Sequence, residues 1–341
     1  MLNFNTIALF LDNELNFSLV VIFFSIFLSL PFDKNFFVRL KKLLFFTAIT
    51  FIVSISLKSL FAVSRPCAKL NLSFCQEGYS FPSSHSAVSF SLLFFSLFNK
   101  NFFLTLIFSL FISYSRIFLF AHTLIDVVGG FIIAFFVFYF LFFENLKEKI
   151  LWKNEGNEMI RQSIHLLFGA LSLFFLFVFG KDFSILGLSL LFFIALIFFY
   201  LKLSNFSIWF IEKFLFLAER KYSVPGFGVL TLLIGFLYSL TFFDFPQNFF
   251  LIYFLAIADV FSTLIGKKFG KTPFPLNNKK TIEGSVAFFL SFVPFLLFFP
   301  SLQIFLSLIF AVLAEGLTKN FDDNILIPIF ASIPFLTFKF I

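Results

Sequence analysis

Long apolar runs separated by short polar breaks extend through the whole chain. The runs are continuous and do not alternate between apolar and polar residues, which excludes a transmembrane β-barrel and favours helices. Backbone groups in lipid must be hydrogen-bonded within their own segment, and helices satisfy this requirement. The runs that we interpret as spans are 15–32, 43–62, 84–98, 102–119, 124–143, 164–180, 183–201, 228–243, 248–266, 284–300, 302–318 and 325–341. The pattern predicts an all-α polytopic membrane protein made of two fused transmembrane helical bundles, with about 12 spans.

A charged stretch from Glu144 to Arg161 divides these runs into an N-terminal and a C-terminal set. We therefore predict a transmembrane domain at 1–143, a cytoplasmic linker at 144–160 and a second transmembrane domain at 161–341. The first residues have no basic segment and no small-residue cleavage site, so we expect no cleavable signal peptide.

Composition agrees with a membrane protein, since 60% of the residues are hydrophobic and the mean hydropathy is +1.03. The net charge of +7 is explained by topology, because Lys and Arg concentrate in cytoplasmic loops. If the loop from Lys34 to Lys42 is cytoplasmic, alternation places the polar segments at 58–66, 82–85 and 115–126 at the outer face and the basic loop at 267–280 inside. No soluble aromatic and basic module is present, so we expect no nucleic-acid partner.

Both cysteines, Cys67 and Cys75, fall in one outer loop, where a disulfide and two free thiols are the alternatives.

Three polar clusters interrupt the N-terminal runs, and they contain two of the three histidines of the chain. The clusters are Lys58-x6-Arg65-Pro66, Pro82-Ser83-Ser84-His85 and Ser115-Arg116-x5-His122-x3-Asp126. Each member alone has a structural explanation, such as an interfacial lysine or an i, i+4 pair. Ionisable groups in membrane segments are costly, however, and are functional candidates by default. Their order and spacing together indicate one site.

The residue types suit cleavage of a phosphate through a histidine. Lys58, Arg65 and Arg116 can clamp the phosphoryl oxygens, and Ser83 with Ser84 at a helix start suits an anion. A neutral imidazole at His122 can attack phosphorus and form a phosphohistidine. Asp126 can orient that imidazole and stabilise its charged form, and His85 can protonate the leaving oxygen. This chemistry requires no metal or other cofactor.

These clusters resemble the three-part signature of the type-2 phosphatidic acid phosphatase superfamily, with Ser84 where glycine is usual. The resemblance covers about residues 10–143 and implies a helical bundle with a metal-independent lipid phosphate or pyrophosphate phosphatase. It implies phosphate binding at Lys58, Arg65, Ser83 and Arg116, an acid at His85, and a nucleophile at His122 held by Asp126. Because the family often has six spans, the segment from Phe4 to Leu11 is expected to form a short extra or interfacial helix.

The C-terminal half contains a second set of charged residues, all cytoplasmic in the same threading. The set comprises Arg161-x3-His165, Glu219-Arg220-Lys221, Pro225-Gly226-Phe227-Gly228, Asp259, Gly266 to Lys271, Lys279 to Gly284, Glu315 and Asp322-Asp323-Asn324. Basic loops are expected inside, but carboxylates within apolar helices, such as Asp259 and Glu315, indicate function.

Glycines beside lysines suit a polyphosphate, and nearby carboxylates suit a Mg²⁺ ion that bridges phosphates. The predicted nucleotide-binding residues are Gly266, Lys267, Lys268, Gly270, Lys271, Lys279 and Lys280, and the predicted metal ligands are Asp259, Glu283 and Asp323. The chain has no GxxxxGK[ST] motif, so this is not a P-loop enzyme.

Residues 155–341 resemble the dolichol kinase and phytol kinase family and, more distantly, phosphatidate cytidylyltransferases. Gln162 stands where the kinase family commonly has lysine. The resemblance implies a membrane-embedded kinase that uses Mg²⁺ and takes CTP as the phosphoryl donor.

Together the two halves predict a bifunctional isoprenoid-lipid enzyme of the cell membrane. Its outer site would hydrolyse a polyprenyl (pyro)phosphate, and its cytoplasmic site would phosphorylate the isoprenoid alcohol with CTP, as in recycling of a carrier lipid. One alternative is a phosphatidate phosphatase fused to a diacylglycerol kinase or cytidylyltransferase. Another is a non-catalytic membrane scaffold or transporter. The lipid, its chain length, the residue that activates its hydroxyl and the oligomeric state stay open.

Overall fold

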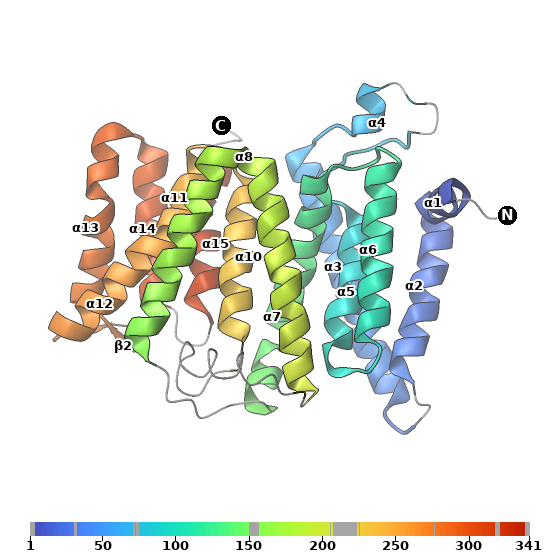
Figure 1. Ribbon diagram of the computed structural model, residues 1–341, viewed down its shortest axis with the longest axis horizontal. Coiled ribbons are helices and arrows are strands. Elements are labelled where there is room, and N and C mark those ends of the chain that lie inside the picture. The colour runs from blue at the N-terminus through green and yellow to red at the C-terminus, as the bar shows by residue number, and fades with distance from the viewer. Residues whose placement is uncertain are drawn as a thin grey trace. The chain divides into compact units, whose positions relative to one another are not determined.

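The computed structural model describes residues 4–30, 33–70, 72, 75–149, 157–204, 206, 224, 226–275, 277–317 and 321–337. These residues are almost entirely helical, and every apolar run predicted to span the membrane contains a helix (Figure 1). Among the described residues, 4 helices are long and apolar enough to cross a membrane, or 5 if one bent helix pair counts as a span. The all-α membrane fold is therefore confirmed, whereas the 12 spans and the two separate bundles stay predictions.

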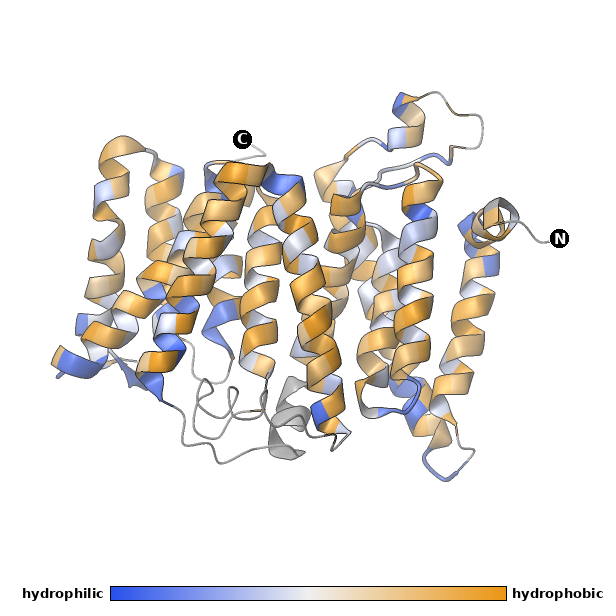
Figure 2. Cartoon of the chain, in the orientation of Figure 1, coloured by the Kyte–Doolittle hydropathy of each residue, from blue (hydrophilic) through white to orange (hydrophobic). Residues whose placement is uncertain are grey.

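The chain divides into two compact units, which we call unit 1 and unit 2. Unit 1 comprises Met1–Lys149 with Tyr200–Phe206, and unit 2 comprises Ile150–Phe199 with Ser207–Ile341. The domain limits predicted from the sequence, 1–143 and 161–341, stay predictions. Apolar residues cover the helices of each unit, and hydrophilic residues gather near helix ends and in the connecting segments (Figure 2).

Unit 1 is built from helices that pack around the buried helix α5. The helices are α1 (Phe4–Asp12), α2 (Glu14–Ser29), α3 (Phe36–Phe61), α4 (Pro66–Lys69), α5 (Ser84–Phe95), α6 (Phe102–Phe118) and α7 (Leu124–Lys149), with a 3₁₀ turn at Ser96–Phe98. Phe94 of α5 packs between Phe131 and Phe135 of α7, with ring centroids 5.6 and 5.5 Å away. A Cβ atom at Gly130 would lie 2.4 Å from the carbonyl oxygen of Ser83, so only glycine permits this approach of α7 to α5.

The N-terminal helix α1 is short and turns by 91° into α2. Asn13 makes this turn, and its side chain caps α2 by accepting the backbone N–H groups of Leu15 and Asn16 at 3.0 and 3.3 Å. The expected extra helix at Phe4 to Leu11 is therefore present, in the form of α1.

Unit 2 contains most of a long helix, α8 (Glu158–Leu203), whose last residues from Tyr200 belong to unit 1 and which is broken at Gly180 where φ is 79°. The other helices are α10 (Phe227–Phe242), α11 (Gln247–Tyr253), α12 (Asp259–Phe269), α13 (Ile282–Phe298), α14 (Leu302–Leu317) and α15 (Asp323–Thr337), with a π-helical segment at Phe254–Ala258. A hairpin of β1 (Pro273–Phe274) and β2 (Asn277–Thr281) connects α12 to α13. The hairpin was not predicted from the sequence, because its short, polar strands lack the alternation of a half-buried strand.

Candidate active site

The three N-terminal clusters come from four helix ends in unit 1. Lys58 is in the last turn of α3, Ser84 and His85 begin α5, Arg116 is near the end of α6, and Asp126 is in the first turn of α7. Arg116, His122, Lys58 and Arg65 all lie close enough to His85 to interact with it electrostatically, so the three clusters surround one site. The structure thus joins residues that lie as much as 68 positions apart, from Lys58 to Asp126.

His122 and Asp126 form the centre of this site. The Nδ1 atom of His122 lies 3.7 Å from Oδ2 of Asp126, and both side chains are almost fully buried. This separation exceeds a hydrogen bond, and the buried Nδ1 atom has no hydrogen-bond partner. A small approach of the two side chains would therefore complete the bond that orients a catalytic imidazole.

The start of α7 fixes the carboxylate of Asp126. Its Oδ2 atom accepts the backbone N–H of Thr123 at 2.7 Å, and Oγ1 of Thr123 accepts the backbone N–H of Asp126 at 3.3 Å. This reciprocal pair is a capping box, so the local sequence Thr-x-x-Asp itself holds the acid. Ser80 donates a further, long bond of 3.5 Å to Oδ1 of Asp126.

Burial keeps the imidazole of His122 neutral. Desolvation lowers the pKa of His122 to about 4, an effect that Asp126 opposes and that Lys58 and Arg65 reinforce. At neutral pH the ring therefore has the unprotonated nitrogen that attack on phosphorus needs.

The start of α5 brings Ser83, Ser84 and His85 to the same site. Ser83 caps the helix by accepting the N–H of Ser86 at 3.4 Å, and its own backbone N–H donates to the carbonyl oxygen of Asp126 at 2.9 Å. The Nε2 atom of His85 is buried without a hydrogen-bond partner, and the ring of Phe17 lies 4.4 Å away. An unpartnered imidazole nitrogen inside the site is available to a substrate oxygen.

The three predicted phosphate-binding cations differ in their contacts. The Nε atom of Arg65 is buried and has no hydrogen-bond partner, so it can donate to a bound anion. Lys58 donates to the carbonyl oxygen of Tyr79 at 3.0 Å. Arg116 is 1% exposed and forms an ion pair with Asp12 at the end of α1.

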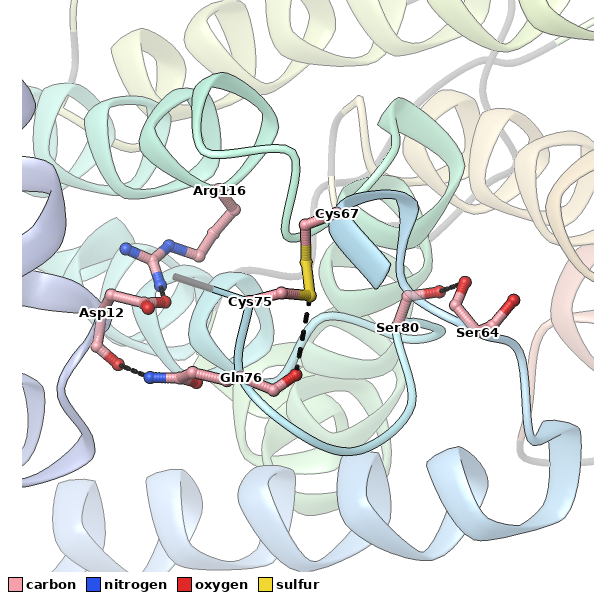
Figure 3. Close-up of a disulfide and its surroundings, with 7 residues drawn as sticks. All are labelled: Asp12, Ser64, Cys67, Cys75, Gln76, Ser80 and Arg116. Carbon is pink, nitrogen blue, oxygen red and sulfur yellow. Dashed lines mark hydrogen bonds and ion pairs between the residues drawn. A yellow bond between two sulfur atoms is a disulfide. The ribbon is translucent and has the colours of Figure 1, made fainter. Parts of the chain in front are cut away.

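A disulfide between Cys67 and Cys75 closes the loop that precedes the second cluster (Figure 3). The chain then returns beside the residues that connect α3 to α4, where Ser64 and Tyr79 form an isolated antiparallel bridge and the N–H of Ser80 donates to the carbonyl oxygen of Val63 at 2.7 Å. Of the two alternatives for the cysteines, the structure has the disulfide.

Unit 2 contains a buried acidic cluster around Lys280. The Nζ atom of Lys280 lies 2.7 Å from Glu315, 3.4 Å from Asp323 and 3.8 Å from Asp259. Burial alone would lower the pKa of Lys280, but Asp323, Asp259 and Glu315 outweigh it and raise that pKa above its ordinary value. Both carboxylate oxygens of Asp259 are buried and lack a hydrogen-bond partner. The π-helical segment directly before Asp259 is a distortion often found at functional sites.

The other predicted residues of unit 2 lie outside this cluster. The carboxylate of Glu283 accepts the backbone N–H of Thr272 at 3.0 and 3.3 Å, beside the hairpin. Lys267 pairs with Glu158 at 3.0 Å. The side chains of Lys268, Lys271 and Lys279 are exposed.

The predicted glycines have a packing role in this structure. A Cβ atom at Gly266 would lie 2.8 Å from Oγ1 of Thr281, and one at Gly270 would lie 2.2 Å from the carbonyl oxygen of Gly266. Their role in nucleotide binding stays a prediction. The residues from Glu219 to Lys221 and Pro225 lie outside the described residues.

Sequence reasoning missed some residues that contact these sites. Asp12 was not singled out, although a carboxylate that ends an apolar segment was a usable signal. Glu315 was included in the cytoplasmic set but given no role there; it contacts Lys280, and Ser262 and Ser285 donate to it at 2.8 and 3.2 Å. Among the described residues, no group of three or more His, Cys, Asp or Glu could by itself hold a metal ion.

Comparison with known proteins supports the N-terminal site. Residues 39–149 match the PAP2 superfamily, and this range contains all three clusters of unit 1. The match indicates a phosphatase of lipid phosphates and, with the apolar helices, an integral membrane protein. It does not extend into residues 161–341, so the resemblance of that half to dolichol kinase stays a proposal.

A second comparison relates the chain to an archaeal protein. The uncharacterized protein MJ1137 of Methanocaldococcus jannaschii is 35% identical over 176 residues, which cover 50% of this chain and 88% of that protein. The chain belongs to the same family as this protein, whose name states no activity. No solved structure matches the chain.

Proposed function

We propose that unit 1 hydrolyses an isoprenoid or polyprenyl phosphate or pyrophosphate through a phosphohistidine at His122. The observation that carries this proposal is the pair of His122 and Asp126, buried at 3.7 Å and within electrostatic range of Lys58 and Arg65. A neutral nucleophile, an orienting carboxylate and cations for the phosphoryl oxygens are the parts that the reaction needs.

The reaction follows two steps. Nδ1 of His122 faces Asp126, so Nε2 attacks phosphorus, the bond to the leaving oxygen breaks, and His85 donates a proton to that oxygen. Asp126 stabilises the positive charge that develops on the ring of His122. In the second step His85 takes a proton from water as the water oxygen attacks the phosphohistidine. Inorganic phosphate and the regenerated imidazole of His122 result.

Substitution of His122 tests this mechanism. His122→Ala should abolish phosphate release from a lipid phosphate in detergent micelles, and wild-type activity should persist in EDTA. His165→Ala is the matched control, because His165 is the third histidine of the chain and belongs to unit 2. A strict metal requirement, or activity retained by His122→Ala, would exclude the histidine mechanism.

The isoprenoid tail is proposed from the resemblance of residues 155–341 to dolichol and phytol kinases. The alternative substrate is phosphatidate, which offers the same phosphate to the same cations. A panel of polyprenyl phosphate, polyprenyl pyrophosphate and phosphatidate at equal surface concentration separates the two, and a clear preference for phosphatidate would replace the isoprenoid assignment.

For unit 2 we propose phosphorylation of a polyprenol or other isoprenoid alcohol with CTP as donor. The supporting observation is the buried cluster of Asp259, Glu315 and Asp323 around Lys280. Mg²⁺ commonly takes one or two protein carboxylates together with substrate phosphates, and the unpartnered oxygens of Asp259 suit this role, with Asp323 as the second ligand. The ion would supply charge neutralisation at the nucleotide phosphates.

The kinase proposal is tested with labelled nucleotides. Purified protein should transfer phosphate from CTP, in preference to ATP, to a polyprenol or phytol but not to diacylglycerol. Asp259→Asn should remove this transfer and leave the hydrolysis in unit 1 unchanged. Transfer at the normal rate by Asp259→Asn would leave Asp259 with a structural role.

We also propose that the phosphatase site faces outward and that the nucleotide site faces the cytoplasm. This arrangement rests on the distribution of Lys and Arg among the loops. Single cysteines introduced near Gln76 and at Lys271, in a chain without Cys67 and Cys75, should react with an impermeant reagent from opposite sides of the membrane. Reaction of both from one side would exclude the arrangement.

A further inference from the structure

Arg116 is held by three groups of unit 1, two of which lie outside the three sequence clusters. Its terminal nitrogens form the ion pair with Asp12 and donate to the carbonyl oxygen of Ala8 at 3.0 Å. Its Nε atom donates to Oγ of Ser115 at 3.3 Å. Asp12 and Ala8 both belong to α1, so this helix provides two of the three contacts.

The position of Asp12 is itself fixed by packing and hydrogen bonding. Ala8 packs in one cluster with Leu119 and Ala121, which belong to the turn between Arg116 and His122. On the other side, Nε2 of Gln76 donates to the carbonyl oxygen of Asp12 at 2.9 Å (Figure 3). Gln76 directly follows Cys75, so the disulfide-closed loop holds Asp12 at the end of α1.

We infer that Asp12 is the positioning residue for Arg116 in the phosphatase site of unit 1, an inference that rests on the function proposed for that unit. A guanidinium group has five N–H donors in a rigid plane. Asp12, Ala8 and Ser115 engage one donor on each nitrogen, so one N–H on each terminal nitrogen stays available to a phosphate oxygen. Fixing the plane of the guanidinium group fixes the direction of both remaining donors.

A carboxylate beside an anion-binding arginine allows a second explanation with the opposite consequence. If Asp12 were only an internal anion that competes for Arg116, its removal would strengthen phosphate binding. If Asp12 positions Arg116, its removal weakens binding and turnover, because a displaced arginine no longer meets the phosphoryl oxygens. The packing of Ala8 in α1 against Leu119 and Ala121, in the turn before His122, favours positioning.

The test is a double-mutant cycle between Asp12 and Arg116. Wild type, Asp12→Ala, Arg116→Ala and the double variant are compared for kcat and KM with a lipid phosphate, and for the Kd of inorganic phosphate. Asp12→Ala should lower kcat/KM by about 10- to 100-fold, the size of effect expected from a displaced binding group. In the Arg116→Ala background, Asp12→Ala should lower kcat/KM by less than about twofold, since the two residues act as one unit.

Two further variants separate positioning from general damage. Asp12→Asn keeps an oxygen that accepts from the guanidinium group and should recover most of the activity. Asp33→Asn removes a negative charge from the exposed ion pair with Arg39 and should leave both constants unchanged. If Asp12→Ala does not fold, Gln76→Ala takes its place in the cycle, with a loss of about threefold that disappears without Arg116.

The inference is overturned if Asp12→Ala binds inorganic phosphate more tightly or leaves kcat/KM unchanged. It is also overturned if the loss of kcat/KM in the double variant equals the product of the losses in the two single variants. Failure of the proposed function looks different, because the wild-type protein would then release no phosphate at all. In that case the Kd values for inorganic phosphate alone complete the cycle and decide the role of Asp12.

Discussion

Asp126→Asn is the substitution that tests the electrostatic part of the phosphatase mechanism most directly. The Oδ2 atom of Asp126 accepts from Thr123, so the oxygen of the new amide should take that place and the cap of α7 should survive. The amide nitrogen then replaces Oδ1, near the hydroxyl of Ser80, which can accept from it. The shape of the site is kept and only the negative charge is lost.

The magnitude follows from the separation of 3.7 Å between His122 and Asp126. When His122 carries a phosphoryl group its ring is positively charged, and a unit charge at this distance is worth about 4 kcal/mol at an effective dielectric constant of about 20. Because each 1.36 kcal/mol is a factor of ten in rate, kcat should fall by roughly 10²- to 10³-fold. KM should change little, since the imidazole is neutral before attack.

The assay is phosphate release from a lipid phosphate in mixed micelles, over a range of substrate surface concentrations. Asp33→Asn is the matched control, because Asp33 pairs with Arg39 at 2.9 Å between α2 and α3, outside the three clusters. That variant should keep its kcat within about twofold, as is usual for exposed ion pairs. If Asp126→Asn keeps more than a third of the wild-type kcat, Asp126 does not stabilise a charged His122 and the proposed role is wrong.

Three further predictions concern pH, packing and charge. The neutral form of His122 predominates above its pKa of about 4. The value of kcat/KM should therefore be unaffected by this group above about pH 5 and should fall tenfold per pH unit below about pH 4. A decline of kcat/KM with an apparent pKa near 6.5 would contradict the burial of the ring. Gly130→Ala should lower the free energy of unfolding by about 1–3 kcal/mol and impair phosphate release, because its Cβ would lie 2.4 Å from the carbonyl oxygen of Ser83. Gly187→Ala, whose Cβ would meet nothing within 4 Å, should change neither stability nor phosphate release. Lys280→Ala should destabilise unit 2 by about 3–5 kcal/mol in thermal or denaturant unfolding, because it leaves buried carboxylates without their cation. Lys279→Ala, at an exposed position, is the control, and equal stability of the two variants would contradict the ion-pair geometry.

The amino-acid sequence by itself determined the features that depend on neighbouring residues. Continuous apolar runs predicted the helices, because every backbone hydrogen bond of a helix is made within a few positions of the chain. The pairing of His122 with Asp126 was also local, since residues at i and i+4 at a helix start lie close together. The three clusters could be recognised as one phosphate site because each carries its chemistry within a short segment.

Only the tertiary structure decided which distant residues complete the sites. Asp12 lies 104 positions before Arg116, and Glu315 lies 35 positions after Lys280. Glu283 was predicted from the sequence as a metal ligand, yet the carboxylate of Glu283 accepts the backbone N–H of Thr272 beside the hairpin. Gly130 was not singled out either, because nothing near it in the chain shows that Ser83 packs against it. A pattern of apolar and polar residues shows that a side chain is buried, but its partner depends on how helices pack against one another, and that is a property of the whole fold.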